Sequence, residues 1–387
     1  MQRFYFDHNA TTPVAEEVFD AMRPLFLDVY GNASSIHHYG QMAKQKLEQA
    51  RREMAGLVGC DASGIVFTGG GTEADNLATL GFVRHHPSDR KHVITSAIEH
   101  PAVLNACAQL EREGVEVSYV ATGADGVVDP DDVRRALKPH TVLISVMHAN
   151  NEVGTVQPVE EIARIARESG IAMHSDGVQA AGKIPLDTRG LDLDFYAVSG
   201  HKFYGPKGIG ALYVRKGSRL GPVLFGGHHE RDRRPGTENV PGAVGMGRAA
   251  LLARQHLTME PERLAALRDR LEQGILDRVP RAHVNAGGAV RVPNTSNIRF
   301  DGIEGEAMVI ALDLRGFAVS SGAACSSGAV EPSHVLLAIG LSPEAARSSL
   351  RFSLGAANTA EQVDALVEAV AASVAHLRRI SPAVVHA

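Results

Sequence analysis

A lysine in a glycine-rich turn is the first residue whose surroundings suggest chemistry. Lys202 lies in the segment Ser199-Gly-His-Lys-Phe-Tyr-Gly-Pro-Lys-Gly, directly after the apolar run 195–198. An amine whose pKa is lowered by its surroundings is a nucleophile that forms a Schiff base with a carbonyl, such as the aldehyde of pyridoxal phosphate (PLP). Ser199 and His201 flank the lysine with hydrogen-bond donors suited to a phosphate. The alternative is an ordinary surface lysine in a loop.

A carboxylate upstream favours the cofactor interpretation. Asp176 ends a second short strand-like run, 172–175, and is followed by Gly-Val-Gln179. PLP enzymes place an acid beside the pyridine nitrogen, because a protonated ring acts as an electron sink. Ligands of open α/β sheets lie outside the carboxyl ends of the strands. Two neighbouring strands would therefore bring Asp176 and Lys202 to opposite ends of one cofactor.

A glycine-rich turn predicts a phosphate site. The run Gly69-Gly-Gly71-Thr72 follows the β-branched segment 64–68 and opens a predicted helix. The unpaired N–H groups and the dipole of a helix N-terminus favour an anion. No Gly-Lys-Ser/Thr follows, so this is not a nucleotide-binding P-loop. Together with Asp176 and Lys202, the turn supplies what a PLP phosphate requires.

Two further polar residues follow predicted strands. His100 comes after the strand 91–96 and precedes a helix-starting proline. A histidine there could lie flat on a cofactor ring or act as an acid or base, although a structural role is the usual one. Asn151 follows the continuous apolar run 141–147, which is typical of a strand buried on both faces of a parallel sheet.

The chain has three cysteines, Cys60, Cys107 and Cys325, and no CxxC pair. This odd number supports neither a disulfide framework nor a zinc site, and no metal is predicted. Cys325 stands in a run of small residues, Ser-Ser-Gly-Ala-Ala-Cys-Ser-Ser-Gly-Ala, where exposure and reactivity are easier to achieve than in a packed element. Cys60 is interpreted as a turn residue and Cys107 as a buried small residue.

The motifs around Asp176, Lys202 and Cys325 resemble those of a known family. They are similar to the fold-type I, class V PLP-dependent enzymes, in particular the cysteine desulfurases of the NifS/IscS type. The resemblance implies an α/β fold with two domains. The large PLP-binding domain would span residues 15–257 and hold a mostly parallel sheet, and residues 1–14 and 258–387 would form a smaller α+β domain that carries the Cys325 loop.

The resemblance also assigns the site residues. It implies that Cys325, Lys202 and His100 are catalytic, and that Arg351, with Asn151, binds the substrate carboxylate as a bidentate arginine does. Arg347 stays an alternative to Arg351. The implied cofactor-binding residues are Gly71, Thr72, His100, Asn151, Asp176, Gln179, Ser199, His201, Lys202 and Thr237.

Thr237 matches a threonine that reaches the phosphate of the neighbouring subunit's cofactor, which implies a homodimer. The sequence also departs from the family at Gly177, where relatives often carry alanine, and we expect this change to be tolerated because Asp176 and Gln179 are present.

The implied reaction is PLP-dependent removal of sulfur from L-cysteine. It gives L-alanine and a persulfide on Cys325, which passes to an acceptor protein, either an iron-sulfur scaffold or a thiolation enzyme. A selenocysteine lyase or another PLP-dependent aminotransferase or lyase is the nearest alternative. A non-catalytic partner that only binds sulfur carriers is less favoured, because it would need neither Lys202 nor Asp176.

Composition agrees with a two-domain α/β enzyme. The chain has 387 residues, of which 44% are hydrophobic and 21% charged. Strands alternate with helices from about residue 64 to 214, which favours a mostly parallel sheet with right-handed crossovers. A net charge of -5 gives no electrostatic case for binding nucleic acid or membranes. We expect a cytoplasmic protein, because the sequence has neither a signal segment nor 18 consecutive apolar residues.

Overall fold

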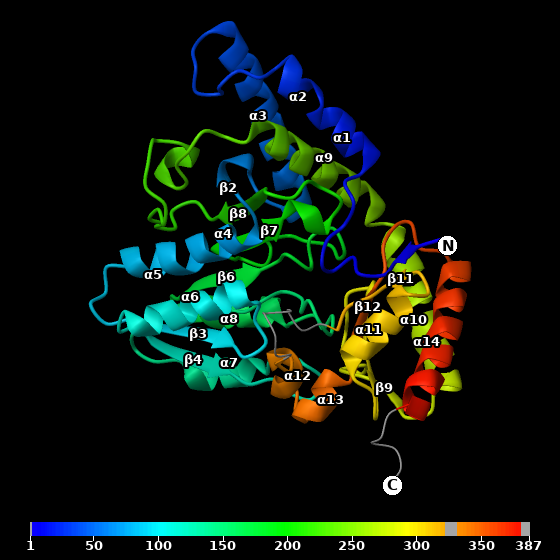
Figure 1. Cartoon of the computed structure of the whole chain (residues 1–387). Helices are drawn as coiled ribbons and strands as arrows, with labels where there is room; N and C mark the ends of the chain where they lie inside the picture. The colour runs from blue at the N-terminus through cyan, green and yellow to red at the C-terminus, as the bar shows by residue number, and fades with distance from the viewer. Residues whose placement is uncertain (1, 322–330, 381–387) are drawn as a thin grey trace.

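The computed structural model describes residues 2–321 and 331–380 of the chain. In this part of the chain a seven-stranded sheet has the order β2-β8-β7-β6-β5-β3-β4 (Figure 1). Only β8 runs opposite to the others. The strands are β2 (Ile65–Thr68), β3 (His92–Ser96), β4 (Glu116–Val120), β5 (Thr141–Ser145), β6 (Ala172–Asp176), β7 (Phe195–Ser199) and β8 (Gly210–Val214). The predicted α/β class and mostly parallel sheet are confirmed.

Helices cover both faces of this sheet, because successive side chains of a strand point to opposite sides. On β2, Ile65 and Phe67 pack into one apolar core and Val66 packs into another. The first core also holds α3 (His38–Val58), α7 (Pro130–Ala136), α8 (Val159–Glu168) and α9 (Val240–His256). The second holds α4 (Gly71–Asn76), its π-helical continuation Leu77–Gly81, α5 (Phe82–His85) and α6 (Pro101–Arg112).

A second group of elements has its own apolar core. An antiparallel sheet of order β12-β10-β9 packs against α10, α11 and α14. The bounds of these elements are β9 (Ala282–Val284), β10 (Thr295–Phe300), β12 (Ser349–Ser353), α10 (Glu260–Arg278), α11 (Gly305–Asp313) and α14 (Ala360–Ile380). The division of the chain into domains at residues 14/15 and 257/258 stays a prediction.

The N-terminal segment lies with this second group. Strand β1 (Phe4–Tyr5) pairs in parallel with β11 (Phe317–Ala318), and Phe6 is fully buried in the apolar core that α10, α11 and α14 share with the antiparallel sheet. Figure 1 shows this blue segment beside the yellow-to-red elements from the end of the chain. As a result, residues 7–12 run between the second group and the large sheet.

The remaining elements are short. They are α1 (Glu16–Met22), α2 (Pro24–Leu27), α12 (His334–Ala338), α13 (Pro343–Arg347) and 3-10 turns at Ala62–Gly64, Gly200–Lys202 and Glu230–Asp232. A search of the described residues finds no helix with the length and apolar character needed to cross a membrane.

Strand β5 ends earlier than its apolar run predicts, at Ser145. Val146 and Met147 are still buried, but the Met147 N–H donates to Glu99 Oε1 (2.8 Å) and not to a neighbouring strand. The apolar run outlasts the strand because the turn that follows is itself buried.

Candidate active site

The two strands predicted to carry the lysine and the carboxylate are neighbours. β6 ends at Asp176, and β7 ends at Ser199 and leads into the 3-10 turn that ends at Lys202. The strands pair in parallel, with Asp176 opposite Ala197. Both residues therefore lie at the carboxyl edge of the sheet, where ligands of such sheets bind.

Asp176 is buried at this edge. Its side chain is 4% exposed, and Oδ1 accepts a hydrogen bond from the Val178 N–H (2.9 Å). Burial raises the pKa of this carboxyl, whereas His100 and Lys202 lower it as positive neighbours. A buried carboxylate that gains from nearby positive charge is suited to a protonated ring nitrogen.

Lys202 has a lowered pKa. Burial, followed by the positive charge of Arg351, lowers the pKa of this amine to about 8, while Asp176 and Asp7 act in the opposite direction. Nζ donates to two backbone carbonyls, Asn9 O (2.6 Å) and Ala10 O (2.8 Å). About a tenth of the amine is thus unprotonated at pH 7, far more than for an ordinary lysine, and this is the reactive form.

His100 is the N-cap of α6. Its Nδ1 accepts a hydrogen bond from the Ala102 N–H (3.1 Å), so in the neutral ring the proton is on Nε2. Burial lowers the pKa of the imidazole, Asp176 raises it, and Lys202 and His334 lower it. The ring is therefore within electrostatic reach of both predicted cofactor contacts.

A cavity of ≈ 840 Å³ adjoins the glycine-rich turn. Its lining includes Gly69, Gly70, Gly71, Thr72, Ser199, His201 and Lys207. Gly71 begins α4, and a β-carbon there would come within 2.8 Å of Val178 Cγ2 and 3.3 Å of Ser199 Cβ. Glycine is thus required where the turn approaches the two strand ends. Backbone N–H groups, two hydroxyls and a lysine form a donor set that suits a phosphate.

His201 faces this cavity as a neutral ring. Nδ1 is 3.1 Å from Thr11 Oγ1, and burial, followed by Lys202, lowers the imidazole pKa to about 4. The ring can therefore share one proton with a phosphate oxygen as a hydrogen-bond donor without bringing a charge.

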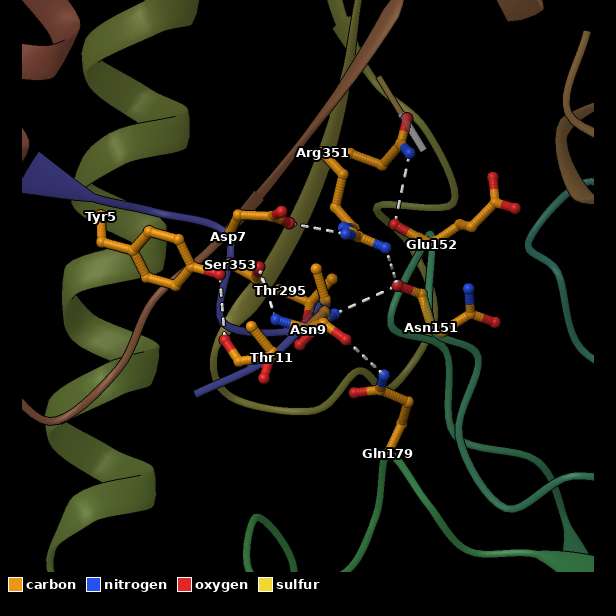
Figure 2. Close-up of polar contacts among 12 residues, drawn as sticks. Tyr5, Asp7, Asn9, Thr11, Asn151, Glu152, Gln179, Thr295, Arg351 and Ser353 are labelled. Carbon is orange, nitrogen blue, oxygen red and sulfur yellow. Dashed lines mark hydrogen bonds and ion pairs between the residues drawn. The ribbon is translucent and has the colours of Figure 1, made fainter. Parts of the chain in front are cut away.

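Arg351 lies on β12 and reaches across to the large sheet, as Figure 2 shows. Nη2 pairs with Asp7 Oδ1 (2.6 Å), and Nη1 donates to Asn151 O (3.1 Å). Its Nε is buried without a hydrogen-bond partner among the described residues. Arg347 instead ends α13 and lines a different cavity with Glu304, Glu306 and Glu331. The geometry favours Arg351 over Arg347 as the residue that faces the site.

Asn9 is a site residue that sequence reasoning missed. Its backbone carbonyl accepts from both Lys202 Nζ and Gln179 Nε2 (3.0 Å), and its side-chain Nδ2 donates to Asn151 O (3.2 Å). Figure 2 shows Asn9 at the centre of these contacts. The polar run that follows β1 was a local signal, but no local pattern connects it with residues more than a hundred positions away.

The predictions for Thr237 and Cys325 are not tested by this geometry. Thr237 lies in an exposed loop before α9 and does not line the cavity. Cys325 lies outside the described residues. The other two thiols, Cys60 and Cys107, are packed among apolar residues, and burial raises the pKa of each to about 12. Both stay protonated, which confirms their structural interpretation.

The residues of this site fit PLP. The glycine turn with Ser199 and His201 suits the phosphate, Asp176 suits the ring nitrogen, and Lys202 suits the aldehyde. Among the described residues, no group of His, Cys, Asp or Glu side chains is arranged to hold a metal ion.

Comparison with known proteins agrees with this geometry. The family described as Aminotransferase class-V matches residues 4–366. The chain belongs to this family. Class-V relatives with high identity include "Cysteine desulfurase IscS" of Methanosarcina thermophila, which is 47% identical over 98% of this chain and 93% of the relative. "Cysteine desulfurase" of Gluconacetobacter diazotrophicus is 48% identical over 99% and 96%.

Solved class-V structures have the same fold. One titled "NIFS-LIKE PROTEIN" has a TM-score of 0.91 and 36% identity, and covers 97% of this chain and 100% of its own. A second, titled "SspA in complex with cysteine", has a TM-score of 0.79 and 38% identity, and covers 90% and 98%. The expected fold type and the resemblance to cysteine desulfurases of the NifS/IscS type are confirmed, and the chain is an enzyme of this group.

Proposed function

We propose that this protein uses PLP to remove the sulfur of L-cysteine, that Cys325 receives the sulfur, and that L-alanine is released. One observation carries the proposal: the paired strands β6 and β7 bring the Asp176 carboxylate and the Lys202 amine to one edge of the sheet, and His100 lies within electrostatic reach of both. This combination supplies a nucleophilic amine, an anion for a ring nitrogen and a proton carrier. The identities with cysteine desulfurases support the choice of substrate.

Each residue of the site has a role that follows from its position. Gly71, Thr72, Ser199 and His201 would hold the phosphate, and Asp176 would hold the ring nitrogen. PLP bound there supplies an electron sink for the electron pair left at the substrate Cα. Lys202, with its pKa of about 8, takes and returns a proton at that carbon, and His100 moves a proton at the sulfur side.

Gln179 and Asn151 would contact the cofactor ring, and Arg351 would bind the substrate carboxylate. The Arg351 guanidinium has one N–H without a partner among the described residues and a second that it shares with Asp7. A carboxylate in this position would replace Asp7 or add to it in a bidentate contact.

The residues on either side of the Cys325 segment support a role for this thiol. Before this segment, the backbone N–H of Arg351 donates to the backbone carbonyl of Ser320 (2.7 Å). After it, Ser333 Oγ donates to Glu152 Oε2 (2.5 Å), and His334 Nε2 lies 2.9 Å from Glu99 O. Ser320, which precedes the segment, therefore lies beside the proposed substrate-binding arginine, and His334, which follows it, lies beside His100. Cys325 as a thiolate would attack the substrate sulfur and form an S–S bond with it. The substrate Cβ–S bond would break at the same time, its electron pair would stay on the carbon skeleton that takes up a proton to become alanine, and the sulfur would remain on Cys325 as a persulfide.

We also propose a homodimer in which Thr237 contacts the phosphate of the partner subunit's cofactor. Its exposed loop position is suited to this role. The sulfur would pass to an acceptor protein, an iron-sulfur scaffold or a thiolation enzyme, and a cytoplasmic location stays a prediction.

The test compares wild type with Cys325→Ala during incubation with L-cysteine and a thiol reductant. Equimolar alanine and sulfide from wild type, and neither from Cys325→Ala, would support the proposal. Cys107→Ala is the matched control, because that thiol is buried and protonated. Equal products from Cys325→Ala would contradict the role of Cys325. Absence of both products from wild type would contradict the proposed reaction, and alanine from selenocysteine would then indicate a lyase.

A further inference from the structure

A second buried lysine lies next to the proposed site. Lys183 follows β6 in the turn after Gln179, and its side chain is 8% exposed. Nζ donates to Gln179 Oε1 (2.5 Å) and to Asn9 Oδ1 (2.8 Å). No salt bridge joins it to a carboxylate within residues 2–321 and 331–380, although a buried lysine is normally paired with one. Burying a lysine amine without a carboxylate partner costs free energy, which indicates a functional role for Lys183.

The contacts of Lys183 determine how the Gln179 amide is oriented. An amide has an acceptor oxygen and a donor nitrogen, and these two ends can exchange by a flip. Lys183 Nζ has N–H groups to donate in either protonation state, and one of them holds Oε1 toward the lysine. Nε2 then donates one N–H to Asn9 O (3.0 Å), and its second N–H remains for a ligand.

Lys183 also holds the residue that positions the reactive amine. Asn9 Oδ1 accepts from Lys183 and from Asn294 Nδ2 (3.1 Å), while Asn9 O accepts from Gln179 and Lys202. One side chain thus restrains both the amide and the segment that contacts the reactive lysine. Burial and the positive charges of Lys202 and Arg351 lower the pKa of Lys183.

We propose that Lys183 is a positioning residue that makes Gln179 present an N–H, and not its carbonyl oxygen, to the acceptor oxygen of the PLP ring. This inference rests on the proposed function, because it assigns Gln179 to PLP. Lys183 touches neither the cofactor nor the substrate in this role and acts through Gln179.

The test measures PLP affinity by equilibrium dialysis of the cofactor-stripped full chain, so that no turnover is needed. Lys183→Met removes the donor and keeps the length of the side chain, and we expect about tenfold weaker binding, equivalent to about 1.4 kcal/mol. Lys183→Arg keeps N–H donors and should restore most of the affinity. In a Gln179→Ala background, Lys183→Met should cause a much smaller further loss, limited to its contact with Asn9, because most of its effect passes through Gln179.

Thermal unfolding of each variant separates this role from a structural one. A purely structural Lys183 would lower the melting temperature equally in both backgrounds and would leave the PLP affinity of folded protein unchanged. That result, or losses of affinity that add in the double variant, would overturn the inference while leaving the proposed function intact. A wild-type protein that does not bind PLP would overturn both.

Discussion

Replacement of Gly177 by alanine should strongly destabilise this protein. A β-carbon on Gly177 would lie 2.0 Å from Tyr196 Cζ and 2.3 Å from its hydroxyl oxygen. Tyr196 is fully buried, and its hydroxyl is 2.9 Å from His148 Nδ1. The ring cannot move toward solvent, and moving it at all breaks this hydrogen bond.

The expected cost combines two effects. Overpacking of a buried site costs about 1–3 kcal/mol, and a buried hydroxyl that loses its partner costs about 1–3 kcal/mol more. We therefore expect Gly177→Ala to lower the free energy of unfolding by about 2–6 kcal/mol. Urea denaturation of wild type and variant at one fixed PLP concentration measures this difference, since bound ligand adds to apparent stability.

Two companion variants make the test specific. Gly288 has open space at its β-carbon position, so Gly288→Ala should change stability by no more than about 0.5 kcal/mol. In a Tyr196→Leu background the ring is absent, and Gly177→Ala should then cost less than about 1 kcal/mol. A loss below about 1 kcal/mol in the wild-type background, or equal losses in both backgrounds, would refute the reasoning.

Three further predictions follow from charged groups. The Lys202 amine has a pKa of about 8, so the rate at which cofactor-free protein captures PLP, measured by absorbance, should rise with pH through a midpoint near pH 8. Arg351→Met removes a neighbouring cation and should move this midpoint to higher pH. Glu230 and Arg51 form a bidentate pair of buried side chains, and Glu230→Gln should destabilise the protein to urea by about 3–5 kcal/mol. Burial raises the pKa of Glu99 from 4.5 to about 8. The protonated Glu99 carboxyl therefore contributes stability that is fully present below pH 4.5 and is lost as the pH rises to 8. Glu99→Gln should reduce this dependence of the free energy of unfolding on pH.

Each of these predictions has a control and a contradicting result. A PLP-capture midpoint that stays in place in Arg351→Met would show that this cation does not lower the lysine pKa. The exposed pair Arg270–Asp364 is the control for the buried pair, and Asp364→Asn should leave the urea midpoint unchanged. If Glu230→Gln behaved like Asp364→Asn, the buried pair would not be a stabilising contact. Equal pH dependence in wild type and Glu99→Gln would exclude Glu99 as the titrating group.

The sequence predicted the fold class and the proposed cofactor contacts near strand ends. A buried parallel strand is visible in the sequence as an apolar run, and the polar or glycine-rich residues at its end follow directly in the sequence. Asp176, Ser199 with Lys202, and the turn at Gly71 were recognisable for this reason, and β6 and β7 bring the first two together as expected.

Tertiary structure alone decided which distant residues complete the site. Asp7 and Arg351 are 344 residues apart, and Asn9 and Gln179 are 170 apart, yet each pair is in contact because β1 returns the N-terminal segment to the end of the chain. The close contact between Gly177, which follows β6, and Tyr196 on β7 also depends on how these two segments pack, and neither segment's sequence shows it. Lys183 reads as an ordinary turn lysine in the sequence, and only burial against Asn9 and Gln179 makes it a candidate for positioning. Local sequence specifies backbone geometry, whereas side-chain contacts across the fold depend on all elements packing together.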